Sequence, residues 1–151
     1  AIDPAVVAIE EAIVVIVRAA SLPRVQDRFV AQSGVAIERA VYGVLREVAE
    51  QGSVRPTELA NSLGLDLSTV SRQVKGLESA GLLARAGDPG DRRAACLTAT
   101  PDGVEALARL RQVRHRFFEE LLANWPVEDR DRLAPLLERL AHEFRALGGQ
   151  L

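Results

Sequence analysis

The sequence has little of several residue types that would point to other classes of protein. It holds a single cysteine, Cys96, in 151 residues, so no disulfide can form within the chain, and this usage fits a reducing compartment. The most apolar stretch, PAVVAIEEAIVVIVRAA, is interrupted by Glu10 and Glu11. It is too short for a membrane span, and it lacks the basic start and the cleavage pattern of a secretory signal. We therefore expect a cytoplasmic protein that makes no contact with a membrane.

Residue patterns that carry catalysis are missing as well. The candidate reactive side chains are Cys96, His115 and His142, and they fall on different expected elements. The sequence has no glycine-rich phosphate loop, no nucleophile elbow and no ligand spacing for a metal ion. We therefore expect no enzyme activity and no cofactor. Cys96 is interpreted as an inert thiol, although its place on an expected strand leaves it partly accessible, and a redox role stays an alternative.

The composition balances hydrophobic against charged residues and is rich in arginine. Hydrophobic residues make up 48% of the chain and charged residues 26%, with a formal net charge of −2. These values fit one compact domain with a real core. They also exclude a protein that binds nucleic acid by bulk positive charge, so any such binding must depend on where individual charges lie.

Apolar residues recur at helical spacing over most of the chain. Residues 6–20 show this spacing and predict a helix that Pro23 kinks or ends. The segment AIERAVYGVLREVAEQG predicts another helix, with Gly52 at its end. Two long helices are expected over residues 101–124 and from Pro126 onward, and Pro135 should bend the second.

Two short helices joined by a tight turn are expected in the middle of the chain. The first begins with Pro56 at its first helical position and ends at Gly64. The second has Asp66 as its N-cap and Gly81 at its C-terminal cap. A helix, a short turn with glycine and a second helix form the helix-turn-helix pattern.

The outer face of the second short helix carries hydroxyls and long hydrogen-bond donors. At about 100° per residue, Val70, Val74 and Leu77 point inward. The opposite side holds Ser68, Arg72, Lys75 and Ser79, with Thr69 and Ser71 on its shoulders and Gln73 nearer the edge. Such side chains suit a helix that enters the major groove of DNA, where arginine and glutamine make bidentate contacts to bases. An ordinary solvated face is the alternative, and the near absence of acidic residues before Glu78 disfavours it.

A hairpin is expected directly after this helix. The stretches LLARA and RRAACLTA both suit strands, and GDPGD closes them with a tight turn. A charged hairpin in this place is typical of a wing whose tip reaches the minor groove. Asp91 lies two residues before Arg93, close enough to pair with it and to hold its guanidinium in a reaching pose. A solvated surface turn is again the alternative.

The stretch ELANSLGLDLSTVSRQVKGLESAGLLARAGDPGDRRAACLTATPDG combines these features with two more motifs. Gly81 and Leu82 lead into the first wing strand, residues 88–93 form a DP-x-DRR tip, and residues 100–103 form a T-P-x-G sequence. In this combination the chain resembles the MarR family of transcriptional regulators over nearly its whole length. The resemblance implies an obligate homodimer of winged helix-turn-helix subunits on a near-palindromic operator. Such a protein is most often a repressor that a small ligand or oxidation relieves.

The resemblance also implies roles for individual residues. Asp91 and Arg93 match the Asp-x-Arg pair of the wing, whereas Arg55 and Ala99 depart from the usual Ser or Thr cap and the usual leucine. Thr69, Ser71, Arg72 and Gln73 match contact positions of the recognition helix. The candidate DNA-binding residues are Arg55, Thr57, Ser68, Thr69, Ser71, Arg72, Gln73, Lys75, Asp91, Arg92 and Arg93.

The expected fold is mostly α-helical with a small β-hairpin wing. Residues 34–100 are expected to form the winged helix-turn-helix domain, and residues 1–33 and 101–151 a helical dimerisation region. The apolar stripes of the flanking helices, one of which starts at Val104, exceed what so small a winged domain can cover. Burial against a second copy of the chain would resolve this excess, and packing within a monomer is the alternative.

The expected partners are a double-stranded DNA operator, a second copy of the chain and a small aromatic or phenolic effector. Phe29, Tyr42, His115 and Trp125 could line an effector cleft, but each is more often a core or interface residue, so no ligand site is assigned. A winged-helix module that binds protein in place of DNA, or a redox-responsive regulator using Cys96, is the alternative function.

Overall fold

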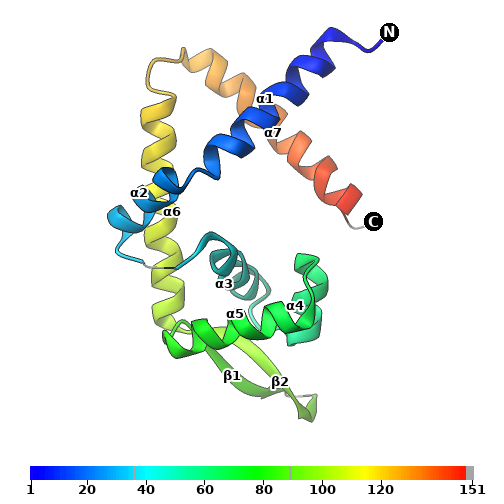
Figure 1. Cartoon of the computed structure of the whole chain (residues 1–151), viewed down its shortest axis with the longest axis vertical. Coiled ribbons are helices and arrows are strands. Elements are labelled where there is room, and N and C mark those ends of the chain that lie inside the picture. The colour runs from blue at the N-terminus through cyan, green and yellow to red at the C-terminus, as the bar shows by residue number, and fades with distance from the viewer. Residues whose placement is uncertain (36, 89, 149–151) are drawn as a thin grey trace. The chain divides into compact units, whose positions relative to one another are not determined.

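The computed structural model describes residues 1–35, 37–88 and 90–148, and over these residues it is mostly helical with one antiparallel hairpin (Figure 1). The expected fold class is confirmed. The elements in chain order are α1 (Pro4–Ala20), α2 (Pro23–Ser33), α3 (Arg39–Gln51), α4 (Pro56–Leu63), α5 (Leu67–Ser79), β1 (Leu83–Asp88), β2 (Asp91–Ala99), α6 (Pro101–Leu121) and α7 (Val127–Gly148). The chain divides into two compact units, Ala1–Val113 and Arg114–Leu151.

The helix α2 is an element that the apolar spacing did not predict. Pro23 does follow the end of α1, as expected, but it also occupies the first turn of a new helix. That helix ends at Gly34, which has a φ of 69° and donates its backbone N–H to the carbonyl of Val30. Proline at a helix start and glycine after its end are the usual termini of a helix. Both signals were therefore present in the sequence.

The core of the first unit lies between α3, α4, α5 and the hairpin. Its buried side chains from the helices are Val44, Leu45, Val48, Leu59, Ala60, Val70, Val74, Leu77 and Leu107. Leu83 of β1 and Leu97 of β2 complete the cluster together with Val54. The inward stripe predicted for α5 is thus confirmed. Since this stripe fixes the rotation of α5 about its axis, it also decides which residues of the helix face solvent.

The hairpin is tied to the segment that precedes α4. Its register runs from Leu83 opposite Ala99 to Gly87 opposite Ala95, with an irregularity between Gly87 and Asp88. Val54 and Leu97 exchange two backbone hydrogen bonds, with N···O distances of 3.1 and 2.8 Å. This bridge couples the base of the hairpin to the start of the helix-turn-helix segment.

Cys96 is buried, so the expectation that it is partly accessible was wrong. Consecutive residues of a strand point to opposite faces, and Leu97, its neighbour, is buried as well. Both faces of β2 are therefore covered at this point. The alternation of residues along a strand predicts one buried face and cannot reveal that the opposite face is buried as well.

The junction between the hairpin and α6 requires a glycine. The hydroxyl of Thr100 donates to the carbonyl of Gly81 at 2.6 Å and accepts the backbone N–H of Gly103 at 3.0 Å. A Cβ at Gly103 would collide with the backbone carbonyl oxygen of Leu82. The T-P-x-G motif therefore places the first turn of α6 directly against the residue that enters the wing.

The inner face of α6 differs from the expected stripe at its start. Val104 is exposed, whereas Gly103 and Ala106 are buried together with Leu107 and Leu110. The close approach at Gly103 turns that residue inward, and Val104 is consequently turned out.

The second unit consists of the end of α6 and the whole of α7. Phe117 and Phe118 make an edge-to-face contact with ring centroids 5.7 Å apart. In α7 the described residues include none that is buried, and Pro135 lies inside the helix, as the sequence indicated. Across the described residues, no helix has both the length and the apolar character needed to cross a membrane.

Candidate nucleic-acid interface

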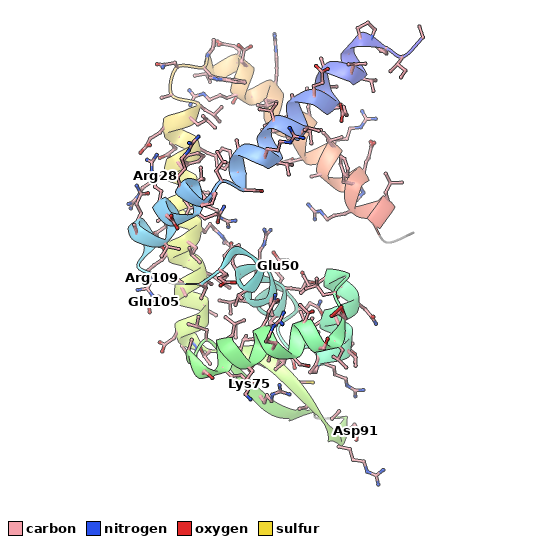
Figure 2. The ribbon with its side chains drawn as sticks, viewed as in Figure 1. Arg28, Glu50, Lys75, Asp91, Glu105 and Arg109 are labelled. Carbon is pink, nitrogen blue, oxygen red and sulfur yellow. The ribbon has the colours of Figure 1, made fainter. Side chains whose placement is uncertain are left out.

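The solvent face of α5 is built by the burial of its opposite side. Ser68, Ser71, Arg72, Lys75 and Ser79 are exposed, and Thr69 and Gln73 are half-buried at the flanks. Figure 2 shows Lys75 on α5 and Asp91 at the tip of the adjoining hairpin. The structure thus brings most of the candidate residues onto one helix and its neighbouring hairpin.

Asp66 stands at the N-cap position of α5 but does not make the expected capping bond to the backbone. Its carboxylate instead accepts the hydroxyl protons of Thr69 at 2.6 Å and of Ser68 at 3.1 Å. The Thr69 hydroxyl, followed by that of Ser68, stabilises the charged carboxylate and lowers the pKa of Asp66 below its ordinary value. With its proton donated to Asp66, each hydroxyl oxygen can act towards any other group only as a hydrogen-bond acceptor.

Arg55 and Thr57 lie at the start of α4. Arginine has no side-chain acceptor and cannot replace a Ser or Thr cap. The backbone N–H of Arg55 donates to the carboxylate of Glu58 at 3.1 Å, which is one half of a capping box. Glu58 therefore supports the helix start where the usual cap is missing, and Thr57 is exposed beside it.

At the hairpin tip, Asp91 and Arg93 contact each other differently from the expected side-chain pair. The carboxylate of Asp91 accepts the backbone N–H of Arg93 at 2.9 Å. Both side chains are exposed. Asp91 therefore shapes the backbone that carries Arg93 and does not hold its guanidinium. Pro89 and the side chain of Arg92 lie outside the described parts of the chain.

An ion pair that sequence reasoning missed connects α5 to the hairpin. Arg85 of β1 donates from Nε to the carboxylate of Glu78 at 2.8 Å. Glu78 is the acidic residue that ends the donor-rich face of α5, and Arg85 partly neutralises it. The seven-residue separation spans two different elements, so helical periodicity could not have revealed the pair.

Tyr42 and His115, two of the four side chains considered for an effector cleft, lie in different units of the chain. Tyr42 packs against the core of the first unit. In the second unit, His115 lines an open hollow with Phe118, Glu119, Leu122 and Arg130. Within the described ranges, no group of three His, Cys, Asp or Glu side chains lies close enough to hold a metal ion.

The arrangement of a helix-turn-helix followed by a charged hairpin defines a winged-helix DNA-binding regulator. The MarR family model matches residues 37–95. The uncharacterized HTH-type transcriptional regulator YxaD of Bacillus subtilis is 37% identical over 108 residues, which cover 72% of this chain and 76% of that protein. The chain belongs to the MarR family, whose regulators bind DNA and act as dimers.

Two solved structures share the fold. A transcriptional regulator of Thermotoga maritima has a TM-score of 0.68 at 30% identity, and the match covers 91% of this chain and 94% of that one. A MarR family protein of Bacillus stearothermophilus has a TM-score of 0.79 at 22% identity, and the match covers 95% and 99% of the two chains. The winged-helix fold and the flanking helices are therefore common to these proteins.

Proposed function

We propose that this protein is a homodimeric transcriptional repressor that binds a near-palindromic DNA operator. In this proposal α5 of each subunit enters the major groove, and the hairpin tip follows the adjoining minor groove. The observation that carries it is the solvent face of α5, where exposed hydroxyls, Arg72 and Lys75 stand opposite a fully buried apolar stripe. The candidate DNA contacts remain the eleven residues on α4, α5 and the hairpin that the sequence indicates.

The apolar surfaces of the flanking helices support the homodimer. The described residues of α1 include none that is buried, and Val15 and Ile16 are 65% and 61% exposed. In the second unit, Leu136 and Phe144 of α7 are 63% and 60% exposed. Extended apolar surfaces of this kind usually mark an interface in a water-soluble protein. We assign residues 1–33 and 101–151 to dimerisation and residues 34–100 to DNA binding.

Release of the operator by a small aromatic or phenolic effector belongs to the same proposal. Adding such compounds to the preformed complex and following dissociation tests it. The burial of Cys96 counts against the alternative of a redox switch at that thiol, because oxidants reach exposed thiolates first.

Selection of bound duplexes from a random DNA pool tests the main proposal. We expect a two-fold symmetric motif whose half-sites are centred about one helical turn, roughly 10 base pairs, apart. The spacing follows from two recognition helices related by a two-fold axis. Recovery of a motif without two-fold symmetry, or of no motif at all, would contradict the proposal.

A further inference from the structure

The side chain of Gln73 on α5 has a buried oxygen that the rest of the molecule does not use. Its Oε1 is shielded from solvent and accepts no hydrogen bond within the described part of the chain. A buried carbonyl oxygen without a donor destabilises the folded state, because it has given up its hydration. Buried polar atoms of proteins nearly always have a partner. An unbranched apolar side chain such as methionine would fit the same flank without this cost.

Gly76, one turn further along α5, is a second residue that does not serve the stability of the helix. It lies inside α5 and is not among the glycines with a positive φ, so the backbone conformation does not require it. A Cβ placed there would meet no other atom within 4 Å. Glycine in a helix interior is less stable than alanine, so packing does not explain its presence either.

The two positions are related by the geometry of the helix. Residues three apart are neighbours on one side of a helix. Side chains of a helix lean towards its N-terminus, so a side chain at position 76 would cover the surface above Gln73. Glycine leaves that surface open. The open side of Gln73 adjoins the exposed face that carries Arg72.

We propose that Gln73 turns outward through the opening above Gly76 when the protein binds DNA, and reads an adenine in the major groove. This inference rests on the proposed function. A glutamine amide pairs with adenine by accepting from the N6 amino group and donating to N7. The base therefore supplies the donor that the oxygen lacks in the free protein. Gln73 thereby gains a partner in the complex, and Gly76, although unfavourable for the helix, leaves room for the movement.

Two variants test the proposal on an operator selected with the wild-type protein. Gln73→Met removes the unpartnered oxygen, and Gly76→Ala narrows the opening by one methyl group. We expect both to raise the thermal midpoint. Gln73→Met should weaken operator binding about ten-fold and abolish the preference for an A·T pair at one position of each half-site, as expected for one lost bidentate contact. Gly76→Ala should weaken the preference for an A·T pair at the same position of each half-site.

Matched controls come from elsewhere in the first unit. Gly43 lies inside α3 and also has open space at its Cβ, so Gly43→Ala should raise the thermal midpoint and leave operator binding unchanged. Gln51 is exposed at the end of α3 and is not among the candidate DNA contacts, so Gln51→Met should leave the base preference of the operator unchanged. These controls separate a general gain in helix stability from a specific loss of base reading.

The outcomes distinguish this inference from the proposed function. If the wild-type protein selects no operator, the proposed function fails and this inference fails with it. If it selects one, the inference alone is overturned by any of three results. The first is a thermal midpoint of Gln73→Met at or below that of the wild-type protein. The second is a loss of affinity for Gln73→Met that is equal on every duplex. The third is a half-site in which no preferred A·T pair responds to both variants.

Discussion

At the scale of single residues, the partners of a side chain decide what it can offer to DNA. Ser68 and Thr69 are hydroxyl residues, which can donate or accept a hydrogen bond. Their protons are donated to Asp66, so in this conformation their oxygens can only accept a further hydrogen bond. Contacts from these oxygens to phosphate, which is itself an acceptor, are therefore disfavoured. Arg72 makes no such hydrogen bond within the described part of the chain, and its guanidinium offers donors alone.

Arg72→Ala is expected to weaken operator binding by about 1–3 kcal/mol and to relax the preference at one base position, if the guanidinium pairs with a guanine. Titration of single-substitution duplexes measures the effect. Arg111→Ala, an equal change of charge at an exposed position of α6, serves as the control. A uniform loss on every sequence would instead make Arg72 a phosphate contact.

At the scale of elements, the base and the tip of the hairpin are held by different contacts. Its base is held by the bridge between Val54 and Leu97 and by the pair of Arg85 with Glu78. Its tip is held by the bond from the Arg93 backbone to Asp91. The wing therefore has a fixed base and a locally shaped tip that carries a cationic side chain.

Arg93→Ala should weaken operator binding and make it less dependent on salt, because one fewer cation displaces fewer counterions. Asp91→Ala should also weaken binding, although it removes a negative charge near DNA, because the backbone N–H of Arg93 loses its acceptor. Asp91→Asn keeps an acceptor and should restore binding. Titrations of one operator duplex at several salt concentrations measure all three.

An increase in affinity for Asp91→Ala would show that the carboxylate acts only by its charge. Binding of Arg93→Ala that equals wild type would remove the hairpin tip from the interface.

Gly103→Ala is expected to destabilise the fold by about 2 kcal/mol, because its Cβ meets a backbone carbonyl that cannot rotate away. Urea denaturation followed by circular dichroism gives the change in unfolding free energy. Gly43→Ala should shift the same free energy in the opposite direction by about 0.5–1 kcal/mol. A neutral Gly103→Ala would mean that α6 can start further from Leu82 than the structure places it.

At the scale of the whole molecule, the exposed apolar faces of α1 and α7 are the main unsatisfied feature. The winged-helix core is closed within the first unit, and its central side chains are fully buried. The flanking helices instead leave large aliphatic and aromatic side chains in water over most of their length. Association with a second copy of the chain would cover them.

Light scattering at micromolar concentration should give a mass of about twice the 16.3 kDa of one chain. Leu136→Glu combined with Phe144→Glu should shift the protein towards monomer, because two charges would enter the interface. Asn61→Asp adds a charge at an exposed site of α4, outside the residues assigned to dimerisation, and should leave the mass unchanged. A monomeric wild-type protein would contradict the dimer.

The sequence by itself determined the type and order of most elements. The inward stripe of α5, the glycines that end α4 and follow α5, and the hairpin after them all depend on local preferences and short spacing. A buried stripe on a helix also fixes its opposite face. This is why the sequence alone predicts that Arg72 and Lys75 face solvent.

Only the tertiary structure decided the burial and the hydrogen-bond partners that depend on several elements. The cover over Cys96, the collision that forces glycine at position 103 and the pair of Arg85 with Glu78 each join parts of the chain with no common period. The partners of Asp66 and Asp91 are local, but each carboxylate could choose between a side chain and the backbone. The spacing of residues does not show which of several nearby donors a carboxylate will accept. Only the three-dimensional geometry decides which hydrogen bond forms.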